Sequence, residues 1–101
     1  MSIEFTTRDI LTWTGGNKIQ GSENTTFNAT SIDTRSLREG ALFVAIRGNK
    51  YDAHNFLSEA MNKKAAGLLI SQRRKLPESS QKCSIIAVRD TTKALGDIAK
   101  G

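Results

Sequence analysis

Apolar residues fall into short runs that are separated by polar, turn-forming stretches. Three of these runs have the length of a strand and no charged residue: residues 42–46, 68–71 and 84–88. Such runs are typical of strands that are covered on both faces of a sheet. Residues 27–32 alternate more loosely between polar and apolar, which indicates one half-buried strand. The pattern predicts a sheet of about four strands, with polar loops at residues 18–24 and 72–82.

Helical spacing of apolar residues recurs in three segments, which are residues 5–13, residues 53–64 and the segment after Asp90. Each has a side chain at its start that can cap a helix: Thr6 or Thr7, Asp52 and Asp90. In the first helix Asp9 favours the N-terminal turn, and Trp13 is expected to anchor the core. The second helix is expected to turn one side inward: Phe56, Leu57, Ala60 and Met61. Its end carries Lys63 and Lys64, which complement the helix dipole.

The order of these elements predicts the fold class. The strand at 42–46, the helix at 53–64 and the strand at 68–71 form a strand–helix–strand unit, which should cross over with a right hand. A length of 101 residues suits one domain. We therefore expect a single domain over residues 1–101 with an α/β fold, a roughly four-stranded and partly parallel sheet, and about three helices.

Composition excludes several classes of protein. Hydrophobic residues make up 38 % and charged residues 25 %, as in soluble globular domains. The apolar runs are too short to span a membrane, and the first residues do not form a signal peptide, so a cytoplasmic location is favoured. Cys83 is the only cysteine and His54 the only histidine. The chain therefore has no internal disulfide, no cysteine metal cage and no multi-histidine metal site.

The net charge of +5 is compatible with nucleic acid, with a membrane surface or with an anionic small ligand. Basic residues are scattered, except for residues 73–75, which precede a stretch of loop composition. Aromatic residues make up 6 % and do not alternate with the basic ones, so a stacking platform for nucleic acid is disfavoured. A nucleic-acid-binding module remains an alternative, as does a solvated basic surface without a ligand.

Motifs for independent catalysis are missing. The sequence has no Gly-x-x-x-x-Gly-Lys-[Ser/Thr] phosphate loop, no Gly-x-Gly-x-x-Gly and no Gly-x-Ser-x-Gly. Two polar turns flank the strand at 42–46 instead. The first offers the Thr34 hydroxyl and the Arg35 guanidinium, and the second offers Arg47 and Lys50 before a helix start. The turns suit an anionic ligand such as a nucleotide diphosphate, although a capped helix with solvated charges explains the same residues. Taken by itself, His54 is interpreted as a residue that forms a structural hydrogen bond rather than as a catalytic base.

Two stretches of the chain form recognisable motifs. The first runs from Asp33-Thr34-Arg35-Ser36-Leu37 through Gly40 and residues 42–48 to Tyr51-Asp52-Ala53-His54-Asn55-Phe56, and the second is residues 88–96. In order and spacing they resemble the amino-terminal domain of the Mur ligases over nearly all of the chain. Ala53 and Asn55 stand where that family more commonly has Gly and Asp, and the helix start tolerates both changes.

The resemblance implies a fold and a role. Such a domain holds the UDP end of UDP-N-acetylmuramoyl-tripeptide and has no cofactor and no catalytic residue of its own. The chemistry belongs to a central ATP-binding domain and a C-terminal domain, which this chain lacks; with ATP and Mg²⁺ they join the tripeptide to D-alanyl-D-alanine for peptidoglycan synthesis, on which cell shape and division depend. The motifs favour that ligase. The equivalent domain of the preceding ligase of the family, and an interaction domain without a small ligand, stay as alternatives.

By position, the resemblance also implies the residues that contact the UDP moiety. The first turn supplies four of them: Ile32, Asp33, Thr34 and Arg35. The second turn supplies three: Asn49, Lys50 and Tyr51. Arg47 and His54 are weaker candidates beside them.

Overall fold

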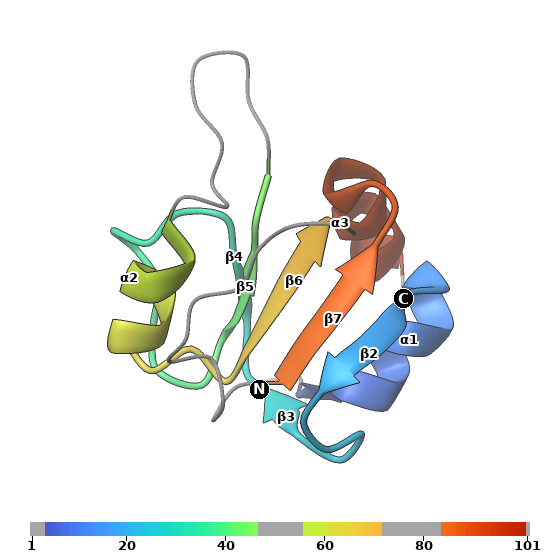
Figure 1. The fold of residues 1–101 in the computed structure, drawn as a ribbon, viewed down its shortest axis with the longest axis horizontal. Coiled ribbons are helices and arrows are strands. Elements are labelled where there is room, and N and C mark those ends of the chain that lie inside the picture. The colour runs from blue at the N-terminus through green and yellow to red at the C-terminus, as the bar shows by residue number, and fades with distance from the viewer. Residues whose placement is uncertain (1–3, 47–55, 72–83, 101) are drawn as a thin grey trace.

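The structure is a computed structural model that describes residues 4–46, 56–71 and 84–100 (Figure 1). Five strands form the main sheet in the order β2-β7-β6-β5-β4: β2 (Asn17–Gln20), β7 (Ser84–Val88), β6 (Gly67–Ser71), β5 (Leu42–Val44) and β4 (Thr30–Ser31). Two shorter strands pair separately: β1 (Phe5–Thr6) and β3 (Thr26–Phe27). The described helices are α1 (Thr7–Thr14), α2 (Leu57–Asn62) and α3 (Thr91–Lys100). The predicted α/β class with a partly parallel sheet and three helices is confirmed.

Within the main sheet of the described residues, strands β4, β5, β6 and β7 run parallel, and the edge strand β2 is antiparallel to its neighbour β7. The expected strand–helix–strand unit is β5, α2 and β6, and its two strands pair in register from Leu42 opposite Gly67. Because β4 and β5 are parallel neighbours, their carboxyl ends lie at the same end of the strands, and the segments that follow them start close together. Ligands of α/β proteins usually bind beside these carboxyl ends.

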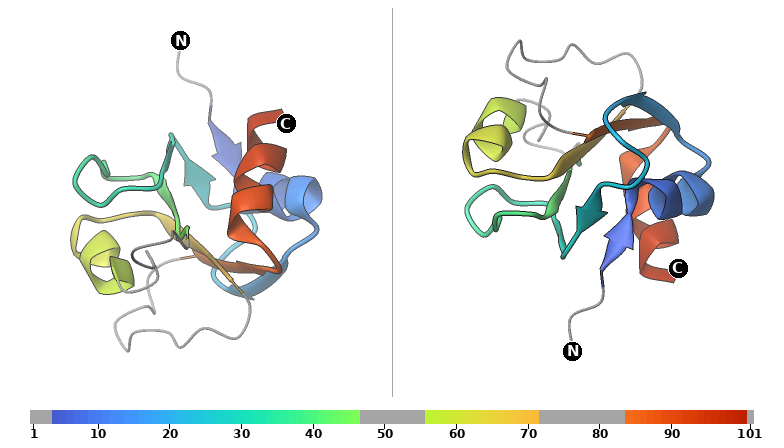
Figure 2. Two further views of the ribbon diagram at one scale, coloured as in Figure 1. Left: turned by 90° about the horizontal axis from the view of Figure 1, so that it is seen from above. Right: turned by 90° about the horizontal axis from the view of Figure 1, so that it is seen from below.

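Helices cover both faces of the sheet, with α2 on one face and α1 and α3 on the other (Figure 2). Side chains alternate between the two sides along β5. Phe43 joins the core cluster under α2, whereas Leu42 and Val44 join the cluster under α1 and α3. All three are at most 1 % exposed, which confirms the prediction that this strand is covered on both faces.

Helix α1 begins with a reciprocal cap. The Asp9 backbone N–H donates to the Thr6 hydroxyl, and the Thr6 backbone N–H donates to the Asp9 carboxylate at 2.9 Å. The helix starts later than predicted because Phe5 and Thr6 pair with β3. Trp13 packs its ring 6.1 Å from that of Phe5 and is partly buried, in line with a role in the core.

The sequence-based expectation for the start of the sheet was wrong in two places. Residues 17–20 form a strand rather than a loop, and the single strand expected over residues 27–32 is two, β3 and β4, in different sheets. The sheet therefore has five strands rather than four. Strand β2 shows no hydrophobic pattern because its first three residues are exposed. It pairs on one side only, with a register shift between Lys18 and Gln20.

Helix α2 also differs from its prediction. It begins at Leu57 instead of residue 53, follows Phe56 as its N-cap, and has no side-chain cap. The expected cap Asp52 lies outside the described residues, as do residues 53–55 and the loop predicted at 72–82. Leu57 and Ala60 are buried as predicted, but Phe56 is 38 % exposed. Helix α3 has the expected cap, since the Asp90 carboxylate accepts from the Thr92 and Lys93 backbone N–H groups.

Two further features concern only the residues that the structure describes. Among their helices, none has the length and apolar character needed to cross a membrane. Among their His, Cys, Asp and Glu side chains, no group of three is arranged to hold a metal ion.

Candidate functional site

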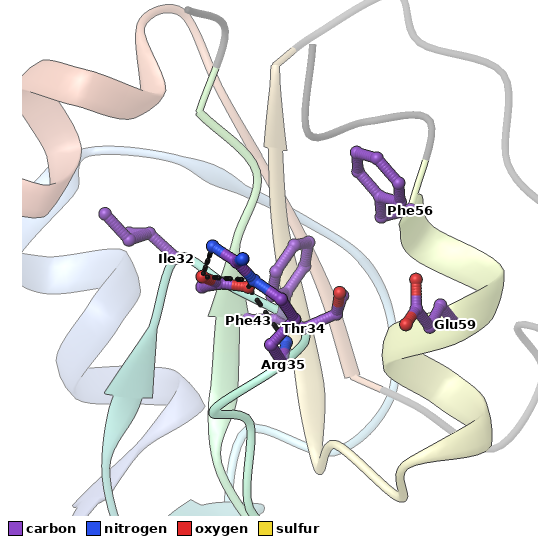
Figure 3. Close-up of a pocket in the computed structure, with 7 residues that line it drawn as sticks. Ile32, Thr34, Arg35, Phe43, Phe56 and Glu59 are labelled. Carbon is purple, nitrogen blue, oxygen red and sulfur yellow. Dashed lines mark hydrogen bonds and ion pairs between the residues drawn. The ribbon is translucent and has the colours of Figure 1, made fainter. Parts of the chain in front are cut away.

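A cavity of about 470 Å³ opens beside the end of β4. Its lining comes from the turn after β4, from β5 and from the start of α2: Ile32, Asp33, Thr34, Arg35, Phe43, Phe56 and Glu59. Figure 3 shows the turn on one side, Phe56 and Glu59 on the opposite side, and the Phe43 ring behind them. All four residues that the sequence predicted in the first turn therefore line one pocket.

The turn is held by an aspartate that binds its own backbone. The Asp33 carboxylate accepts from the Arg35 backbone N–H at 2.9 Å, and from the guanidinium at 2.8 Å for Nη2 and 3.1 Å for Nε. The Ser31 hydroxyl donates to the Asp33 carbonyl at 2.9 Å. The Asp33 and Arg35 side chains are 39 % and 84 % exposed, so solvent screens this ion pair. Its main effect is to give the turn a defined shape.

The Asp33 carboxyl group stays ionised to lower pH than an ordinary aspartate. Hydrogen bonds from the Arg35 side chain are the first cause of its lowered pKa, and the bond from the Arg35 backbone is the second. The folded pKa lies below the ordinary value of 3.8. The ionised Asp33 carboxyl group therefore stabilises the folded chain above pH 3.8, and this contribution is lost as the pH falls through the folded pKa.

We expect an NMR titration of the Asp33 side-chain carboxyl carbon to give a midpoint below 3.8. Arg35→Ala should move the midpoint back toward that ordinary value, because it removes the side-chain hydrogen bonds that favour the ionised form. A wild-type midpoint at or above 3.8 would contradict this account of the turn.

Thr34 is the buried member of the turn, with 7 % of its surface exposed. Its carbonyl oxygen accepts a hydrogen bond from the side-chain ammonium of Lys63, which caps the C-terminal end of α2. The sequence predicted that Lys63 would complement the helix dipole. The structure shows in addition that its side chain reaches the turn on the other side of the pocket.

Three lining residues were not predicted as site residues, namely Phe43, Phe56 and Glu59. Phe43 reads from sequence only as a core residue, because nothing in a run of apolar residues marks the one that borders a cavity. Phe56 and Glu59 are three residues apart, which places them on the same side of a helix. That spacing, next to a strand end already marked as a ligand site, is the signal that could have found them.

The remaining predicted contacts lie outside the described residues: Arg47, Asn49, Lys50, Tyr51 and His54. Phe56, the first described residue after them, lines the pocket. Within the described part of the chain, the pocket combines apolar surface with both kinds of polar group. Arg35 offers donors, and Asp33 and Glu59 offer acceptors. Such a lining can bind a ligand that carries a ring and hydroxyl groups, and the Arg35 guanidinium is its donor for an anionic group.

Comparisons with known proteins connect the chain to a family. The chain is 36 % identical over 83 residues to the UDP-N-acetylmuramoyl-tripeptide–D-alanyl-D-alanine ligase of Haemophilus influenzae, a match that covers 82 % of the chain and 17 % of that protein. The Escherichia coli ligase of the same name is 37 % identical over 84 residues, covering 81 % of the chain and 17 % of the ligase. A crystal structure of MurF from Acinetobacter baumannii matches with a TM-score of 0.80 over 96 % of the chain. The chain belongs to the Mur ligase amino-terminal domain family.

The breadth of the family matters for the function. A UDP-N-acetylmuramoyl-L-alanyl-D-glutamate–2,6-diaminopimelate ligase from Cytophaga hutchinsonii is 32 % identical over 81 residues, covering 80 % of the chain and 16 % of that ligase. Mur ligases that add different groups thus match this chain about equally well. At 23 % identity over 20 % of its own length, the Acinetobacter MurF shows the shared fold alone. No protein-family model matches the chain. The chain spans about a sixth of the length of the relatives named here.

Proposed function

We propose that this Mur ligase domain binds the UDP end of a UDP-N-acetylmuramoyl-peptide. The observation that carries the proposal is the pocket at the end of β4, because the Asp33-Thr34-Arg35 motif of the family forms one side of it. The names of the related ligases from Haemophilus influenzae and Cytophaga hutchinsonii both begin with UDP-N-acetylmuramoyl. A shared substrate end is a reason for related domains to keep one kind of pocket.

The lining supports this choice of ligand. A uracil ring needs apolar or aromatic surface, which the exposed side chains of Ile32 and Phe56 supply. Ribose hydroxyls and the uracil N–H need acceptors, and the Asp33 and Glu59 carboxylates are within the lining. The diphosphate needs donors and positive charge, for which Arg35 and the predicted contact Lys50 are suited. Each part of a UDP group therefore has candidate partners.

In this proposal the domain contributes orientation to a reaction that takes place elsewhere. Binding energy from the UDP end, which does not react, holds the far end of the peptide where the other domains act on it. No catalytic residue and no cofactor is assigned to this domain.

We further propose that the whole ligase adds D-alanyl-D-alanine to the tripeptide precursor in the bacterial cytoplasm, with ATP and Mg²⁺. The related ligases from Haemophilus and Escherichia carry that activity in their names, and MurF from Thermotoga maritima, 28 % identical and with a TM-score of 0.60, has a crystal structure in complex with ADP. The alternative is a ligase that adds diaminopimelate. ATP-dependent ligation by the full-length protein, with D-alanyl-D-alanine and diaminopimelate as competing substrates, separates the two.

The binding proposal is tested by amide chemical-shift titration of this chain with UDP-N-acetylmuramoyl-tripeptide and with UDP. We expect shifts at residues 32–35 for both ligands, with further shifts at residues 49–51. Cytidine diphosphate is the control for recognition of the base. No shift in the first turn at millimolar ligand would contradict the proposal.

A variant of the second turn sharpens the test. Lys50→Ala should weaken UDP binding about ten-fold, the size expected when a charged hydrogen bond to phosphate is lost, and should leave the melting temperature unchanged. Lys18→Ala is the matched control, because it removes the same charge on β2 at the opposite edge of the sheet from β4. If a folded Lys50→Ala chain bound UDP as tightly as the wild type, Lys50 would not be part of the binding site.

The nucleic-acid alternative makes a different prediction. A basic module would bind single-stranded or duplex nucleic acid with an affinity that falls steeply as salt is raised. We expect no such binding, because the basic residues are scattered along the sequence and the aromatic residues do not alternate with them.

A further inference from the structure

Lys63 connects the two sides of the pocket. It follows the last residue of α2, and its side-chain ammonium donates to the carbonyl oxygen of Thr34, 29 positions earlier in the chain. Thr34 belongs to the turn after β4, whereas α2 supplies Glu59 to the opposite side. This side-chain hydrogen bond joins the turn to the end of the helix.

The bond acts on one peptide group of the turn. The peptide between Thr34 and Arg35 is planar and trans, so its C=O and N–H groups point in opposite directions. Lys63 holds the carbonyl end, and the Asp33 carboxylate accepts from the N–H end at 2.9 Å. Rotation of this peptide would break both bonds. Lys63 therefore fixes the orientation in which Arg35 meets the Asp33 carboxylate.

The backbone of Lys63 is itself well anchored. Its N–H donates to the Glu59 carbonyl at 3.1 Å, one turn back in α2. The next residue, Lys64, accepts at its carbonyl from the Gly40 N–H at 3.0 Å, and the Ala66 N–H donates to the Ala41 carbonyl at 2.8 Å. The segment after the helix is thus hydrogen-bonded to the two residues that precede β5, and the Lys63 side chain extends from an anchored backbone.

We propose that Lys63 is a positioning residue for the UDP pocket, which holds the Thr34–Arg35 peptide so that the turn keeps its ligand-binding shape. The inference rests on the proposed function and deepens it, since Lys63 does not line the pocket and acts through Thr34. The pocket then depends on a residue that follows α2 as much as on the motif after β4.

The electrostatics of the turn agree with this role. Arg35 is the main cause of the lowered pKa of Asp33, and the positive charge of Lys63 lowers it further. Removal of Lys63 should therefore raise the titration midpoint of Asp33, by the loss of its charge and by the loosening of the Arg35 contact.

The test compares Lys63→Met with two matched variants. Lys63→Arg retains a charged donor that can reach the carbonyl. Lys93→Met removes one charge from an exposed position of α3, on the opposite face of the sheet from α2. The measurements are the amide shifts of Thr34 and Arg35, the titration midpoint of Asp33, the dissociation constant for UDP and the melting temperature. A melt of each variant shows whether it is folded.

We expect Lys63→Met alone to move the two amide shifts, raise the Asp33 midpoint and weaken UDP binding about five-fold, because a hydrogen bond from a charged donor is lost. Lys63→Arg should restore all three, and Lys93→Met should resemble the wild type. If Lys63→Met leaves the turn unchanged, or changes the turn without changing UDP affinity, the inference is overturned and the proposed function stands. If the wild-type chain binds no UDP, the proposed function fails, and the shifts and midpoint alone decide whether Lys63 holds the turn.

Discussion

Phe43→Ala is expected to lower the free energy of unfolding by about 3–5 kcal/mol, the range for removing a large aromatic side chain from a packed core. The ring is 1 % exposed and joins the core cluster between the sheet and α2. It sits on β5, which pairs with β4 on one side and β6 on the other, so the surrounding backbone has little freedom to close the resulting cavity. In a domain of this size, each 1 kcal/mol lowers the melting temperature by about 4–8 °C.

Ile32→Ala is the matched control for this loss. Ile32 lines the same pocket but is 53 % exposed, so its truncation should change stability by only about 0.5 kcal/mol. Urea unfolding of both variants separates core packing from pocket lining. A loss below about 1 kcal/mol for Phe43→Ala would show that β5 is not the packed centre that its burial indicates.

Gly67→Ala is expected to destabilise the fold by about 1–3 kcal/mol, because it adds a methyl group to a space that is already filled. A Cβ atom there would lie 2.6 Å from Cε1 of Phe27 and 2.9 Å from the carbonyl oxygen of Ser84. Phe27 is fully buried and packs its ring 5.6 Å from that of Phe5, so it cannot swing away. The Ser84 carbonyl belongs to β7, the strand that pairs with Gly67.

The same substitution at Gly96 should have the opposite effect on stability. Gly96 lies within α3, and a Cβ atom there meets nothing within 4 Å, so alanine should stabilise the chain by about 0.5–1 kcal/mol through its helix propensity. Thermal melts of the two variants test this pair. Phe27→Leu combined with Gly67→Ala should recover only part of the loss, since the contact with Ser84 remains. Wild-type stability of Gly67→Ala would contradict the packing seen here.

The parts of the fold that the sequence predicted are the parts that bury apolar side chains or carry a local cap. Strands β5, β6 and β7 are buried almost completely, and each corresponds to an uninterrupted apolar run. Asp90 caps α3 through bonds to residues two and three positions later, a relation that a local pattern can capture. The edge strand β2 pairs through its backbone and leaves its first three side chains exposed, so no hydrophobic period marks it.

The candidate site was predictable on one side only. The Asp33-Thr34-Arg35 turn is built from neighbours in sequence, and both its polarity and its place after a strand pointed to it. The other side depends on which turn of α2 faces β4, which is a matter of packing between distant segments. The bond from Lys63 to Thr34 spans 29 positions and leaves no trace in either local sequence. The first turn is thus local in origin, whereas the pocket is a tertiary property.

The two edges of the main sheet have a consequence for how this chain behaves alone. An open sheet risks joining edge to edge with another copy, which leads to aggregation. Strand β4 offers an edge of two residues, and β2 carries Lys18 beside its register shift, so neither edge presents a long, regular row of backbone groups. Charge, irregularity and shortness are the devices by which natural sheets avoid such association. The short edge next to the pocket is therefore poorly suited to pairing with a strand of another copy.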